Sequence, residues 1–178
     1  MKKKFWTSDK IVSFAAIGIS IFTLFIFVKQ TNIIEEQSHL SVMPYLLMET
    51  ANNGENKTFS IEIVNYGVGP AIIESRIIYF QDKEYDLEFV DFLKNHIPNT
   101  DSITVINNST LQKGFALPAG ASRNLIKVGG DDYSYQNFLK IMQTIQSDSF
   151  NYKIRYKSIY GDRWMISAET NAPVELED

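Results

Sequence analysis

The first hydrophobic pattern in the chain is an unbroken apolar run, Ile11–Val28, which contains no charged residue. As a helix, a run of this length rises about 27 Å, close to the roughly 30 Å hydrocarbon core of a bilayer. Phe5 and Trp6 precede the run, where aromatic rings settle among lipid headgroups, and Lys10 and Lys29 flank its two ends. The pattern therefore predicts a membrane-spanning helix over residues 11–28.

The charges around this segment predict its orientation. Residues 1–10 hold four lysines and one aspartate, whereas the dozen residues after the span hold one lysine and two glutamates. Because positive residues stay on the cytoplasmic side, we expect residues 1–10 in the cytoplasm and residues 29–178 outside it. A cleaved signal peptide is the alternative. Its apolar region is usually shorter and ends in small residues, whereas this one ends FIFVKQTNII.

Residues 29–41 are polar and contain no glycine or proline, so we expect the helix to continue through them as a stalk. Pro44 then marks a change to extended chain. Ile26, Ile33 and Leu40 recur at intervals of seven, which leaves self-association through the span and the stalk open. Three positions are too few to predict a coiled coil.

Beyond the stalk the hydrophobic period becomes two, the period of a strand with one buried face. In residues 150–158, Phe150, Tyr152, Ile154 and Tyr156 alternate with asparagine, lysine and arginine, which indicates a half-buried antiparallel strand. The same reading predicts further strands at Tyr45–Glu49, Thr58–Asn65, Ala71–Phe80, Glu84–Leu87, Ser102–Asn107, Gly114–Leu117, Ser122–Val128 and Arg163–Glu169.

Two stretches, 87–96 and 134–146, space their apolar residues as short helices do. Many short strands separated by turns predict a mainly β domain over residues 42–172, an antiparallel immunoglobulin-like sandwich with one or two short helical insertions. Residues 173–178 would form an acidic tail. The competing architecture is an antiparallel sheet with helices packed on one side.

The composition excludes several classes of function but does not identify one. Of the 178 residues, 44% are hydrophobic and 13% aromatic, enough for a folded core. There is no cysteine and there are two histidines, His39 and His96, which excludes thiolate nucleophiles and sites built on cysteines or several histidines. The net charge of −4 disfavours a nucleic-acid partner. We therefore expect no enzyme activity, no cofactor and no metal.

The most distinctive string, NYGVGPA, joins two strong strands and contains Asn65, Gly67, Gly69, Pro70 and Ala71. Glycine at 67 and 69 allows positive φ, and Pro70 holds Gly69 in an extended conformation. Asn65 can bond the backbone two residues on. A phosphate-binding loop would need a following helix, and here a β-branched strand follows. The string predicts a structural turn.

These motifs also carry a resemblance. The layout of membrane helix, stalk and proline before the first strand is similar to that of a loose group of uncharacterised bacterial membrane-anchored proteins. The shared turns are N-x-G-x-G-P-A at residues 65–71, L-P-A-G at 117–120 and Y-x-x-x-Y-G at 156–161. The resemblance implies a β-sandwich and carries no activity, so it brings no catalytic residues.

Two clusters are candidates for binding. Asp82, Glu84, Asp86 and Glu88 alternate, so in an extended chain they would share one face, where they would hold Ca²⁺ or, as we prefer, discourage edge pairing.

Tyr133 and Tyr135, beside two glycines and two aspartates, form a candidate aromatic patch for a sugar or a partner.

From these observations we expect a single-pass membrane protein whose extracytoplasmic domain is a non-enzymatic protein-interaction or scaffold module with a protein partner in the cell envelope. The rival hypothesis is a module that binds a glycan or small ligand through loops at one end of the sandwich. A concave, aromatic-lined pocket would favour the rival. If the topology is reversed, the domain would be a cytoplasm-facing adaptor at the membrane.

Overall fold

The computed structural model describes residues 8–147, 150–170 and 172–177. The chain divides into two compact units, residues 1–40 and residues 41–178.

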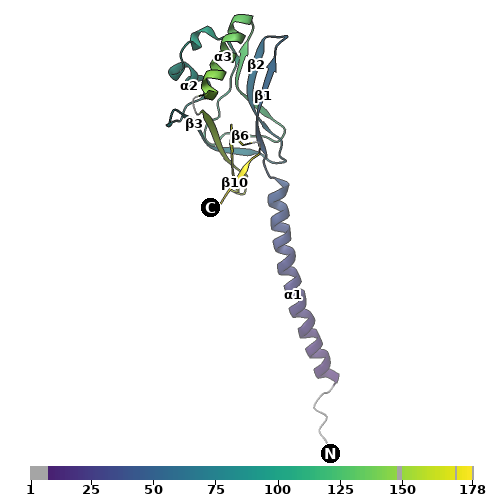
Figure 1. Ribbon diagram of the computed structural model, residues 1–178. Coiled ribbons are helices and arrows are strands. Elements are labelled where there is room, and N and C mark those ends of the chain that lie inside the picture. Colours follow the sequence, from purple (N-terminus) through teal and green to yellow (C-terminus); the bar gives the residue numbers. More distant parts are fainter. Residues whose placement is uncertain (1–7, 148–149, 171, 178) are drawn as a thin grey trace, which may run out of the picture. The chain divides into compact units, whose positions relative to one another are not determined.

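The first unit is built on one helix, α1 (Ser8–Ser41), which continues without interruption through the expected stalk (Figure 1). Every side chain from Ile11 to Val28 is exposed, and α1 is long and apolar enough to cross a membrane. Ser13, Ser20 and Thr23 donate their hydroxyls to the carbonyl four residues earlier at 2.8–2.9 Å. Such bonds satisfy hydroxyl groups within lipid.

The second unit contains two antiparallel sheets (Figure 1). In spatial order, the first sheet consists of β1 (Leu46–Asn53), β2 (Thr58–Asn65), β7 (Ser122–Gly129) and β5 (Val105–Asn107). The second sheet consists of β10 (Val174–Leu176), β9 (Arg163–Ser167), β8 (Asn151–Lys157), β3 (Ala71–Phe80) and β4 (Lys83–Tyr85), with β6 (Ala116–Leu117) paired to β3. The expected order of a long apolar helix followed by an antiparallel β domain is confirmed.

Two α-helices and a 3-10 turn lie at one end of this domain, away from β6 and β10 (Figure 1). They are α2 (Phe89–His96), the turn η1 (Thr100–Ser102) and α3 (Asp132–Ser147). Both expected helical insertions are therefore present, and α3 and α2 each pack against η1.

The strand expected at Gly114–Leu117 is reduced to Ala116–Leu117, and two further segments differ from expectation. Val174–Leu176, expected in an acidic tail, pairs with β9 and adds a strand to the second sheet. The strand expected at 102–107 is shortened to Val105–Asn107, because Ser102 closes η1 instead. In both places the available backbone partner, rather than the side-chain pattern, decides the structure.

The hydrophobic core takes residues from both sheets. Ile61 and Ile63 of β2 and Ile73 and Ile78 of β3 are buried in a single cluster. The alternation expected for β8 is present, since its aromatic and aliphatic positions Tyr152, Ile154 and Tyr156 are buried. One face of each sheet therefore encloses the core.

The turn between β2 and β3 is organised by the buried side chain of Asn65. Its Nδ2 donates to the carbonyl oxygens of Gly69 (2.9 Å) and Leu117 (3.0 Å). Its Oδ1 accepts from the backbone N–H groups of Tyr45 (3.1 Å) and Gly67 (3.0 Å). The side chain thus joins the turn to the chain entering β1 and to β6.

Neither Gly67 nor Gly69 uses the positive φ that glycine allows. Glycine is needed at both positions because the backbone of another segment lies too close to leave room for a side chain. A Cβ on Gly69 would overlap the Val42 carbonyl, and one on Gly67 would overlap backbone atoms of Met43 and Tyr45. The two glycines let the segment that leads into β1 lie directly against the turn.

We predict that Gly67→Ala and Gly69→Ala each destabilise the domain by about 1–3 kcal/mol, since the new methyl group must displace backbone. Chemical denaturation of the full chain in detergent measures the effect. Gly54→Ala is the matched control, because its Cβ would meet only the Tyr135 hydroxyl at 3.9 Å. Unchanged stability in both turn variants would show that the turn tolerates a side chain.

Tyr156 predicts how stability depends on alkaline pH. Its side chain is fully buried, and its hydroxyl oxygen accepts a hydrogen bond from Leu46 N (3.2 Å). Burial raises the pKa of Tyr156 to about 12 from 10.0, although the Leu46 bond acts in the opposite direction. Between pH 10.0 and about 12, the folded protein therefore retains the Tyr156 proton that the unfolded chain releases.

The stabilisation from neutral Tyr156 is complete below pH 10.0 and is lost as the pH rises towards about 12. We expect the free energy of unfolding to fall by up to about 1.4 kcal/mol per pH unit in that window. Urea denaturation on both sides of pH 10.0 measures it. The slope should be shallower in Tyr156→Phe but not zero, since burial also raises the pKa of Tyr152. An identical slope in Tyr156→Phe and in the unmodified chain would contradict the assignment of this pH dependence to Tyr156.

Candidate functional site

The two tyrosines expected to form an aromatic patch separate at the start of α3. Tyr133 is 70% exposed, whereas Tyr135 is 6% exposed and its hydroxyl donates to Asn52 Oδ1 in β1. Because Tyr133 and Tyr135 are two residues apart on a helix, their side chains point to different faces. The expected patch of two tyrosines is therefore wrong, and Tyr133 alone remains available to a ligand.

The start of α3 is fixed by the segment before it. Gly129 and Gly130 both adopt positive φ, at 146° and 92°. Asp131 Oδ1 then accepts from the backbone N–H of Ser134 at 2.7 Å, and Ser134 Oγ accepts from Thr104 N at 2.7 Å. These contacts hold the first turn of α3, and with it Tyr133, against the segment that follows η1.

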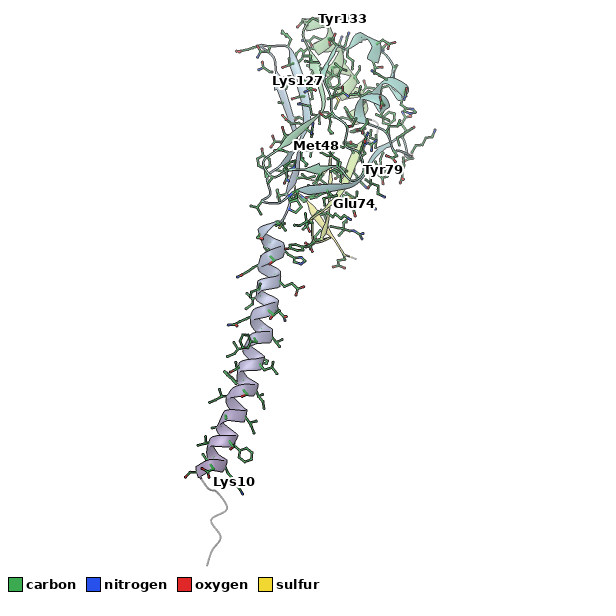
Figure 2. The ribbon with its side chains drawn as sticks, turned by 180° about the vertical axis from the view of Figure 1, so that it is seen from behind. Lys10, Met48, Glu74, Tyr79, Lys127 and Tyr133 are labelled. Carbon is green, nitrogen blue, oxygen red and sulfur yellow. The ribbon has the colours of Figure 1, made fainter. Side chains whose placement is uncertain are left out.

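A cleft of about 430 Å³ lies between η1 and α3, at the end of the domain where Figure 2 shows Tyr133. The volume is within the usual range for small-molecule sites. Five lining residues come from α3 and five from the segment around η1. They are Tyr133, Asn137, Lys140, Ile141 and Thr144 on the helix, and Ile97, Pro98, Asn99, Asp101 and Ser102 opposite.

The helical wall follows from periodicity, because residues three and four apart share a face. Tyr133, Asn137, Lys140 and Thr144 therefore form one row along α3. The opposite wall depends on Asn99, whose φ of 63° is left-handed and turns the chain into η1. Asparagine tolerates this conformation better than most residues.

The cleft offers donors and acceptors without a net charge. Asp101 and Lys140 carry opposite charges, and Asn99 and Asn137 supply amides that both donate and accept. Ile97 and Ile141, buried at the base, are apolar. Together with the exposed ring of Tyr133, this arrangement can hold an uncharged ligand that is polar at its rim and apolar on one face.

The alternating acids at 82–88 do not share a face, so the expected common acidic surface is wrong. Asp82 lies in a turn with φ of 59°, and Glu84 is exposed on β4. Asp86 and Glu88 instead approach Arg76, at 3.7 and 3.2 Å. Among the described residues, no group of three or more His, Asp or Glu side chains is placed to hold a metal ion.

Sequence reasoning identified Tyr133 but missed the rest of the cleft. The helical spacing of Tyr133, Asn137 and Lys140 was a usable signal for one wall. Nothing local indicated that Asn99 and Asp101, more than thirty residues earlier, would form the other. No protein-family model matches the sequence, and no curated protein matches it.

Proposed function

We propose that this protein is a single-pass membrane protein with a cytoplasmic N-terminus and an extracytoplasmic domain that acts as a non-enzymatic binding module of the cell envelope. The length and apolar surface of α1 support the anchor. The excess of lysine in residues 1–10 supports the orientation.

The domain itself we propose to be an immunoglobulin-like sandwich. In the constant-type version of that fold, strands A-B-E-D form one sheet and C-F-G the other. If β1, β2, β3, β5, β7, β8 and β9 are taken as A to G, the order β1-β2-β7-β5 and the run β3-β8-β9 agree with both sheets. Helices α2 and α3 then lie in the C–D and E–F connections as insertions.

The cleft between η1 and α3 carries the proposal of a binding function. It is concave and contains an exposed tyrosine, the feature that favours a ligand-binding module over a protein scaffold. Its amides, hydroxyls and opposite charges suit the hydroxyl groups of a sugar, and the Tyr133 ring suits the sugar's apolar face. We therefore propose a neutral glycan as the ligand of this cleft.

A protein partner is the second candidate, and a different surface favours it. Cationic side chains of β8 gather on the outer face of the second sheet. The two candidates use separate surfaces and therefore have separate tests.

Topology can be tested with a single cysteine, since the natural chain has none. We expect Asn53→Cys, exposed beside the β1–β2 turn, to react with a membrane-impermeant maleimide on intact cells. Ser8→Cys, before the span, is the matched control and should react only after lysis. The reverse pattern would place the domain in the cytoplasm and make it a membrane-recruited adaptor.

The glycan proposal is tested with full chain in detergent on an array of neutral cell-surface oligosaccharides. We expect Tyr133→Ala to weaken binding of the captured oligosaccharide about tenfold, equivalent to about 1.4 kcal/mol, because the ring's contact is lost. Isothermal titration calorimetry measures the affinity.

The matched control is Tyr160→Ala, which removes another exposed tyrosine from the turn between β8 and β9. Its affinity should equal that of the unmodified chain. Equal losses in the two variants, or no neutral oligosaccharide bound at millimolar concentration, would reject the cleft as a glycan site.

A further inference from the structure

The outer face of the second sheet gathers positive charge on an otherwise acidic domain. Along β8, Lys153, Arg155 and Lys157 alternate with the buried residues of the core, so all three lie on the side away from it. Arg163, opposite Lys157 on β9, adds a fourth cation. The rest of the chain beyond the span carries a marked excess of acidic residues.

Half of this basic face is partly neutralised by an internal carboxylate. Glu74 of β3, labelled in Figure 2, lies 3.4 Å from Lys157 Nζ and 3.4 Å from Arg163 Nε. Both cations share this one carboxylate, so each is paired while the group of three keeps one positive charge. This half of the face is therefore less available to a partner than unpaired cations would be.

The other half encloses a hollow of about 370 Å³. Its lining residues come from β3, β4 and β8 and are Ser75, Ile77, Tyr79, Glu84, Lys153 and Arg155. Lys153 Nζ lies 4.5 Å from the centre of the Tyr79 ring, which positions the ammonium group over an apolar surface. Arg155 is exposed, and among the described residues no carboxylate lies within ion-pair distance of it.

Register explains why these groups converge. Arg155 lies opposite Ser75, and Lys153 lies opposite Ile77, so the cations and the apolar residues share one face of adjacent strands. Residues two apart on a strand are separated by about 6.6–6.8 Å. The carboxylates of alternate residues in an extended acidic peptide have the same spacing.

We propose that this hollow binds a short acidic segment of a partner protein, with a carboxylate on Arg155 and a second on Lys153. Glu84 also lines the hollow, on β4, so the two cations of β8 leave one positive charge in excess and the acidic segment would lie along β8. The guanidinium group offers two parallel donors that match a carboxylate. Ile77 and Tyr79 offer apolar contact, which suits the side chains of a polypeptide. A long polyanion would extend over the acidic remainder of the domain and be repelled there, so a short segment is favoured.

The test uses full chain in detergent and a fluorescent peptide that alternates Glu with Leu, at concentrations up to millimolar. We expect saturable binding by fluorescence anisotropy that weakens as salt is added. Replacing every Glu of the peptide by Gln should abolish it. Arg155→Gln should weaken it at least tenfold, whereas Lys157→Gln, the matched control for a cation already paired with Glu74, should change it less than about threefold.

Arg155 is exposed, so Arg155→Gln should leave thermal unfolding unchanged and keep oligosaccharide binding through Tyr133. Failure of the acidic-segment proposal can therefore be distinguished from failure of the glycan proposal. Equal effects of Arg155→Gln and Lys157→Gln, or no saturable binding of the peptide, would overturn the proposal. Inorganic polyphosphate that binds more tightly than the peptide and is lost in Arg155→Gln would overturn it in favour of an anionic polymer.

Discussion

The buried amide of Asn65 is the constraint on which the architecture of the domain depends. Irregular segments cannot satisfy their backbone polar groups in a strand ladder, and burial without a partner is costly. Asn65 supplies those partners for the chain entering β1, for the β2–β3 turn and for β6. These three segments are joined at one end of the domain, and the helical insertions and the cleft between α3 and η1 lie at the other end (Figure 1).

An irregularity in β3 has a comparable effect on the second sheet. The register shifts between Ile73 and Ser75, so that Arg76 lies opposite the buried Ile154. Arg76 then pairs with Glu88 at 3.2 Å, and the Glu88 carboxylate also accepts from Leu111 N at 3.1 Å. The shift takes one cation into a part-buried network at the start of α2 and leaves those of β8 on the outer face.

The two candidate surfaces differ in the physical basis of recognition. The cleft presents an exposed aromatic ring with amides and hydroxyls and has no net charge, so its selectivity would come from hydrogen-bond geometry. The hollow on β3 and β8 presents Lys153 and Arg155 above Ile77 and Tyr79, so its selectivity would come from charge and would depend on salt. A membrane-anchored module with both surfaces would engage a glycan and an acidic protein segment independently.

The sequence by itself determined what depends on near neighbours: the apolar length of α1, the alternation of β8 and the turn positions at Gly67 and Gly69. Only the tertiary structure decided why those glycines are needed, since the obstructing atoms belong to a segment more than twenty residues earlier. It also decided which tyrosine of α3 is buried and which acids meet Arg76. The physical reason is that local sequence sets the period and the turns of a segment. The partner of each face is set by packing among segments distant in the chain, and the cleft at Asn99 and Tyr133 exists only through that packing.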